Sequence, residues 1–145
     1  MYFNNYCRVG LIFLVALFGL HCEHAGPLEF KPEEQPDIPT LSSIQPLLTQ
    51  NCALSGCHAG SNALMGLDLS DGQSYANLVG VPSQEVATLQ LVQPNEPDRS
   101  YLITKIEGTL EMAPGTLKMP IGRPALDEQA INNIREWISH GALNN

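Results

Sequence analysis

The feature that most constrains this chain is a run of seven residues, Cys52 to His58, with the sequence Cys-Ala-Leu-Ser-Gly-Cys-His. The run places two thiols and an imidazole next to one another, and its cysteines are the only ones that follow Cys22. All three side chains can form covalent or metal bonds. The rest of the domain must therefore fold so that the two thiols and the imidazole can reach whatever group they bind.

A Cys-x-x-Cys-His run is typical of covalent c-type haem attachment. Here four residues separate the cysteines, and one of them is Gly56, which allows the longer loop to bulge. Each thiol can add to a haem vinyl group, and His58 is then held beneath the iron as the proximal ligand. We therefore expect Cys52 and Cys57 to bind one haem c covalently and His58 to ligate its iron.

Two other interpretations of the run stay open. Cys52 and Cys57 could form a disulfide, as pairs of cysteines in exported proteins often do, although the histidine beside them would then be a coincidence. The two thiols and His58 also supply three ligands for zinc, but no fourth Cys or His lies close enough in the sequence to complete the site.

The beginning of the chain predicts export. Residues 1–21 carry one charge, Arg8, followed by an apolar run from Leu11 to Leu20 that fits a signal peptide and is too short to span a bilayer. Cys22 at the end of this run suggests a lipoprotein that is cleaved before Cys22 and acylated on its thiol. Ordinary secretion, with cleavage between His21 and Gly26, is the alternative. We expect a periplasmic protein anchored to the membrane through Cys22.

The remaining residues divide into a tether and a domain. Residues 22–40 are rich in proline and acidic residues, which predicts an extended, solvated tether. Residues 41–145 suffice for one domain with a single core. The net charge is −8 and the basic residues are scattered, so nucleic acid is not an expected partner.

Apolar spacing and turn residues predict short helices and no convincing sheet, so the expected fold class is all-α. Helices are expected at about 41–51, 74–79, 98–106 and 127–139. The first should be capped by Ser42 or Ser43. The last carries an apolar stripe made by Ile131, Ile134 and Ile138, with Trp137 beside them.

The irregular stretch between the last two helices holds a second candidate ligand, Met119, which precedes a proline. A thioether sulfur can be the second axial ligand of a haem iron, and a His/Met pair raises the reduction potential. From a loop ahead of the last helix, Met119 can reach the haem face opposite His58. Met112 is the fallback distal ligand, whereas His140 is expected to be a solvated residue at a helix end.

Taken together, these segments resemble class I cytochrome c, and are similar to the small exported cytochrome c-like domains of the planctomycete type. The likeness covers residues 41–145. It is carried by Ile44-Gln45-Pro46-Leu47-Leu48, by Cys52 to His58, by Pro97 to Leu102, by Met119-Pro120 and by Trp137 to Ala142. The family mostly has two residues between the cysteines, so the spacing of four is a departure from its pattern.

The resemblance implies a cytochrome c-like bundle of a few short helices around one covalent haem. It assigns haem attachment to Cys52 and Cys57, proximal ligation to His58 and distal ligation to Met119. It also implies that the first and last helices cross and pack against each other.

The expected function is that of a monohaem c-type cytochrome that carries single electrons to redox partner proteins outside the cytoplasm. With both axial positions filled by protein, it would not be an enzyme. One alternative is a haem-based sensor or peroxidase-like protein whose distal ligand is displaced. The other is a haem-free lipoprotein with a disulfide. Arg123 or Lys105 could pair with a haem propionate.

Overall fold

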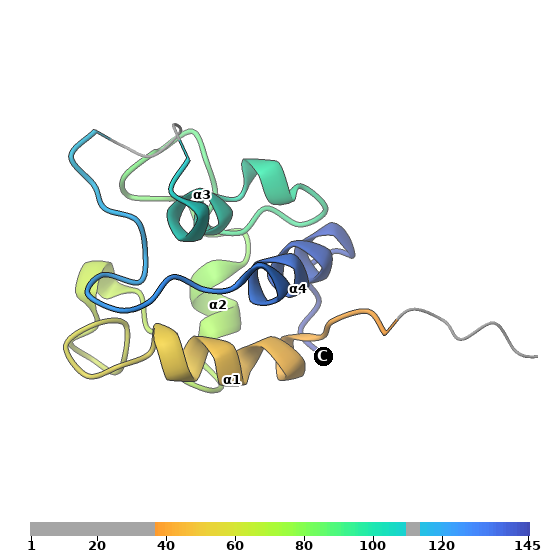
Figure 1. Cartoon of the computed structure of the whole chain (residues 1–145), viewed down its shortest axis with the longest axis horizontal. Helices are drawn as coiled ribbons and strands as arrows, with labels where there is room; N and C mark the ends of the chain where they lie inside the picture. Colours follow the sequence, from red (N-terminus) through yellow and green to blue (C-terminus); the bar gives the residue numbers. More distant parts are fainter. Residues whose placement is uncertain (1–36, 110–113) are drawn as a thin grey trace, which may run out of the picture. The chain divides into compact units, whose positions relative to one another are not determined.

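The regular structure of the chain is helical. The computed structural model describes residues 37–109 and 114–145. Within them lie α1 (Leu41–Asn51), α2 (Ser74–Leu78), α3 (Tyr101–Glu107) and α4 (Glu128–Ser139), with short 3-10 turns at Leu64–Gly66 and Pro97–Arg99 (Figure 1). This part of the chain contains isolated β-bridges but no strand. The predicted all-α class is therefore confirmed for the residues that the structure describes.

Helix α1 has the predicted bounds but not the predicted cap. Its N-cap is Thr40, whose side chain accepts a hydrogen bond from the Ser43 N–H at 3.2 Å. The Ser43 hydroxyl accepts in return from the Thr40 N–H at 3.0 Å, which completes a capping box. The prediction of Ser42 or Ser43 as the cap is wrong because a cap needs an extended backbone. Thr40 has it, whereas Ser43 is the third residue of the helix.

The helix expected at 98–106 is divided in two at Ser100. This residue has an extended backbone and separates the 3-10 turn at Pro97–Arg99 from α3. Its buried hydroxyl accepts from the Gln93 N–H at 2.8 Å and donates to the Glu96 carbonyl at 3.0 Å. Such local side-chain bonds compete with helical ones, which explains the interruption.

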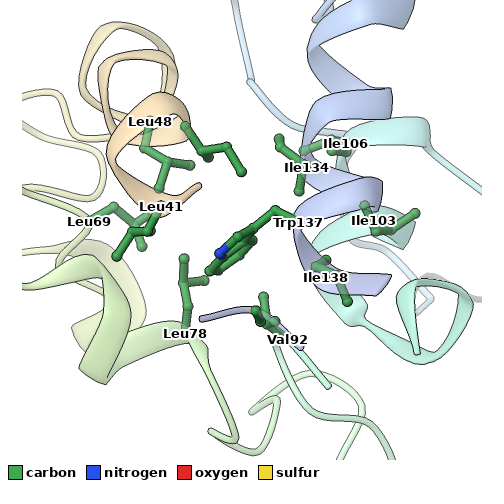
Figure 2. Close-up of a cluster of buried hydrophobic side chains, with 12 residues drawn as sticks. Leu41, Leu48, Leu69, Leu78, Val92, Ile103, Ile106, Ile134, Trp137 and Ile138 are labelled. Atoms are coloured by element: carbon green, nitrogen blue, oxygen red, sulfur yellow. The ribbon is translucent and has the colours of Figure 1, made fainter. Parts of the chain in front are cut away.

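The core lies where α1, α3 and α4 meet. Helix α4 contacts both α1 and α3, and the buried side chains form one cluster. Figure 2 shows the indole of Trp137 projecting from α4 toward Leu78 and Val92. This residue is only 2% exposed, and its Nε1–H donates to the Leu143 carbonyl at 3.0 Å. The expected stripe on α4 is buried at Ile134, Trp137 and Ile138, with Ile131 partly buried against the cluster.

Polar contacts join the same elements. Gln45 of α1 is buried, and its side chain donates to the Leu69 carbonyl at 3.0 Å and accepts from the Ser74 hydroxyl at the start of α2. Periodicity did not single out this glutamine, because it lies between apolar positions on the buried side of α1.

Helices α3 and α4 are also joined by an ion pair. The Arg135 guanidinium of α4 contacts the Glu107 carboxylate of α3 through Nε and Nη2, at 2.8 and 2.9 Å. Its Nη1 donates to Asp98 at 2.6 Å. These contacts fix the relative placement of the helices on the side of α4 that is not apolar.

Candidate functional site

The Cys52–His58 segment begins where α1 ends, and hydrogen bonds close it into a loop. Cys52 is the C-cap of α1, and its N–H donates to the Leu48 carbonyl at 2.8 Å. The Cys52 carbonyl then accepts from the His58 N–H at 3.2 Å, so the two ends of the loop meet. Gly56 has a φ of +79°, which favours glycine, and allows the four intervening residues to bulge as expected.

The residues after the loop are held by its carbonyl groups. The Cys57 carbonyl accepts from the Leu64 N–H at 2.7 Å, and the His58 carbonyl accepts from the Leu69 N–H at 2.9 Å. Leu69 belongs to the core cluster. The backbone that carries the second thiol and the imidazole is therefore fixed to the folded body of the domain.

The four predicted haem-binding side chains lie on the wall of one cleft. The cleft has a cavity volume of about 240 Å³, and Cys52, Cys57, His58 and Met119 all line it. Most of its other lining is apolar and comes from segments far apart in the sequence, including Leu67, Leu78, Leu91, Leu102, Ile106 and Pro120. The fold thus brings Met119 to the same cavity as the Cys52–His58 loop, which lies more than half the domain earlier in the sequence.

The His58 imidazole has an unusual environment. Its Nδ1 atom is buried and has no hydrogen-bond partner among the residues that the structure describes. Buried polar atoms nearly always have partners, and an exception points to a ligand, ion or water at that place. One ring nitrogen of His58, Nδ1, is therefore left without a hydrogen bond by the part of the chain that the structure describes.

The two thiols are free. Burial of Cys52 raises the pKa of its thiol to about 11, with a further rise from Cys57 and a smaller opposing effect from Arg123. Cys52 therefore stays a neutral thiol at physiological pH. Among the described residues, no group of three or more His, Cys, Asp and Glu side chains is arranged to hold a metal ion, so the zinc interpretation gains no support.

One wall of the cleft carries a polar cluster that the sequence did not reveal. Lys105 is only 11% exposed at its side chain and pairs with the Glu85 carboxylate at 3.1 Å. The Tyr101 hydroxyl donates to the same carboxylate at 2.7 Å. Burial raises the pKa of Glu85, but hydrogen bonds from Tyr101 and Lys105 and the lysine charge outweigh it and lower the pKa overall. A lysine one turn after an inward tyrosine was a signal of a buried cation, but nothing in the sequence indicated Glu85 as its partner.

Large apolar side chains are exposed along the cleft. Leu64, Met65 and Ile121 line it, and their exposed fractions are 54%, 55% and 55%. Apolar groups gathered at the mouth of a cleft are typical of a surface that binds an apolar ligand or partner.

Two predicted site residues, Met112 and Cys22, lie outside the described residues. His140 is described and is exposed at the end of α4, away from the cleft lining. None of the helices in the described ranges has the length and apolarity that crossing a membrane requires.

Compared with protein-family models, curated proteins and solved structures, the chain matches none of them. The interpretation of the cleft therefore depends on the residues that line it.

Proposed function

We propose that the protein is a monohaem c-type cytochrome that carries single electrons outside the cytoplasm. One observation supports this most strongly: two thiols, an imidazole and a thioether line a single, largely apolar cleft. Thiols attach haem c, and imidazole and thioether are a common pair of axial ligands.

The residues of the cleft fit a haem in three respects. Apolar side chains from residues 64–69, from α3 and from the segment around Met119 suit the flat apolar body of a porphyrin. The His58 imidazole has a buried nitrogen, Nδ1, with no hydrogen-bond partner among the described residues, which supports a further group at this place. Lys105 and Arg123 place positive charge on the cleft wall, which suits a group with two carboxylates, although the Lys105 ammonium is already paired with Glu85.

Each cysteine has a defined role in this proposal. The S–H of Cys52 and of Cys57 would add across a vinyl C=C bond, with the sulfur bonding to one carbon and the hydrogen passing to the other, so nothing leaves. The closed loop holds both thiols and His58 on one backbone unit. A haem bound there supplies reversible one-electron chemistry at its iron.

The remaining residues would tune this chemistry. Met119 would fill the second axial position, and a thioether ligand in an apolar cleft favours a relatively positive potential. If His58 and Met119 both bound the iron, they would leave no site on it for a substrate, so we propose a carrier and not an enzyme.

The cellular part of the proposal depends on residues 1–22. Their apolar run and Cys22 support export and a lipid anchor on the periplasmic side. Export also brings Cys52 and Cys57 to the compartment in which c-type haem is attached.

The test uses the full chain exported in a host that matures c-type cytochromes, including those with Cys-x4-Cys-His. We expect the denatured protein to keep the added mass of one haem and the reduced protein to show a sharp visible α-band. Changing both Cys52 and Cys57 to alanine should remove the covalent mass. A colourless product with the mass of the polypeptide alone would contradict the proposal and favour a disulfide-containing lipoprotein.

The distal ligand is tested with a matched pair of methionines. Met119 and Met65 both line the cleft. We expect M119L to abolish the weak long-wavelength ferric band that reports an iron–sulfur bond, and M65L to preserve it. Loss of the band in M65L, or in M112L, with M119L unchanged would show that Met119 is not the ligand.

A further inference from the structure

The segment that carries Met119 has no regular structure of its own. We call residues 118–123 the strap; it contains no helix or strand, yet Met119, Pro120, Ile121 and Arg123 all line the cleft. Figure 1 shows the blue trace that leads to α4 passing close to the end of α1. A segment without a helix or strand needs outside contacts to hold one position.

The first contact is at the end of α3. The Met119 N–H donates to the Lys105 carbonyl at 2.8 Å. Beside it, the Lys118 side chain lies directly against Gly108, the C-cap of α3, which has a φ of +73°. A Cβ atom added to Gly108 would lie 2.8 Å from Lys118 Cδ, 3.2 Å from Cγ and 3.3 Å from Cβ.

Gly108 is therefore needed for two separate reasons. Its left-handed backbone ends α3, as glycine commonly does. Its missing side chain leaves the space that Lys118 occupies. Contact reaches back to Lys118 Cβ, so a side chain at position 108 would push on the residue next to Met119 at its Cβ and not only on the flexible end of the lysine.

The second contact is at the end of α1. Arg123 Nη2 donates to the Gln50 carbonyl at 3.3 Å. Gln50 lies in the last turn of α1, where carbonyls lack helical partners and the helix dipole favours a cation. Cys52 follows two residues later, so Arg123 joins the strap to the helix that carries the haem loop. The effect of Arg123 on the pKa of Cys52 agrees with this proximity.

Among the described residues, the guanidinium of Arg123 has no carboxylate partner. Of the lysines and arginines within 37–109 and 114–145, Arg99, Lys105 and Arg135 have carboxylate partners, whereas Lys118 and Arg123 have none. The two unpaired cations of this part of the chain are thus the first and last residues of the strap.

We propose that Gly108 and Arg123 are positioning residues that hold the two ends of the strap and so keep the Met119 thioether in the cleft. The inference rests on the proposed function, because it concerns the distal ligand of that cytochrome. Neither residue contacts the iron; both act through Met119. Arg123 additionally links the distal side of the site to the loop that holds Cys52, Cys57 and His58.

The experiment compares two glycine variants of the haem-loaded protein. G115A is the matched control for G108A, because Gly115 also has a positive φ, +81°, but nothing within 4 Å of an added Cβ. The readouts are the long-wavelength ferric band and the concentration of imidazole that displaces the methionine. A distal ligand that is released more often gives way to imidazole at a proportionally lower concentration.

We expect G108A to weaken the band and to bind imidazole about tenfold more tightly than wild type, while G115A stays within about twofold. The double variant G108A/K118A, which removes Cδ and Cγ of Lys118 but keeps its Cβ, should recover part of the loss. At the other end of the strap, R123A should tighten imidazole binding by about threefold. R99A, which removes the surface ion pair with Glu96, should leave imidazole binding unchanged.

The outcomes separate the two proposals. A wild-type protein without covalent haem would overturn the proposed function and this inference with it. A wild-type protein with haem and the ferric band, in which G108A and G115A behave alike and R123A matches R99A, would overturn only the inference. If G108A does not fold, the R123A and R99A comparison decides, because both arginines are exposed.

Discussion

The packed helices and the cleft are built in different ways. Where α1, α3 and α4 meet, apolar side chains are buried and charged groups are paired, as in Trp137 and in the contact of Arg135 with Glu107. Around the cleft, the Cys52–His58 loop and the strap present free thiols, an unpartnered imidazole nitrogen and exposed apolar groups. The helices satisfy one another, whereas the cleft loops leave thiols, an imidazole nitrogen and apolar groups without partners among the described residues.

This difference predicts that the same kind of substitution has unequal effects in the two regions. We expect W137A to lower the free energy of unfolding by about 3–5 kcal/mol, because it leaves a large cavity in the core. I121A, at the cleft, should cost less than about 1 kcal/mol, because its side chain is mostly exposed. Chemical denaturation of the purified protein measures both, and equal losses would contradict the comparison.

Thiol reactivity sharpens the comparison within the cleft itself. With its pKa raised to about 11, Cys52 should be alkylated about 100-fold more slowly at pH 8 than an unperturbed cysteine, because only the thiolate reacts. The rate should rise with pH until about 11. Mass spectrometry of folded protein from a host without haem-attachment machinery can follow this. A rate like that of a free thiol would show that Cys52 is not buried there.

The ion pair between Arg135 of α4 and Glu107 of α3 allows a test of the polar contacts in the packed region. Hydrogen bonds that Arg135 donates to Glu107, and then to Asp98, raise its pKa and keep it charged. We expect R135Q to lower the free energy of unfolding by roughly 1–2 kcal/mol, because a two-point contact between partly buried groups is lost. Added salt should make this difference smaller. R99Q, which removes the exposed pair with Glu96, should cost less than about 0.5 kcal/mol in the same denaturation series.

The smallest effect is expected from pH. The pKa of Glu85 is lower in the folded protein than its ordinary value, so its contacts stabilise the fold fully above the ordinary carboxyl range. This contribution is lost as the pH falls through the lowered pKa. E85Q should therefore be less stable than wild type at neutral pH, and the difference should shrink in acid. A gap that widens in acid would contradict the assigned direction.

The sequence predicted the helices better than it predicted their surroundings. Helix α1 has the expected bounds because its apolar spacing and the following Cys52 are local signals, whereas its Thr40 cap was missed. The break at Ser100 depends on hydrogen bonds to Gln93 and Glu96 that helical periodicity does not reveal. The 3-10 turn at Leu64–Gly66 was also missed, since Met65 there has a φ of +58°, which is uncommon outside glycine.

The candidate site divides in the same way. Neighbouring residues in the sequence indicated Cys52, Cys57 and His58, and their placement on one loop follows from that. Met119 was indicated by its thioether on the irregular stretch before the last helix and by the resemblance, and only the fold brings it to the same cleft. Glu85 could not be predicted as a cleft residue, because its pairing with Lys105 joins segments that share no local pattern.

The hydrogen bond from the His58 N–H to the Cys52 carbonyl has a practical consequence. Because the backbone meets across the base of the loop, the residues between form a side branch whose tip, Ser55 and Gly56, is exposed. A spectroscopic label attached at Ser55 would sit within a few residues of both thiols without entering the cleft wall. Such a label would report the distance to this side of the molecule of the redox partner that the proposed function requires.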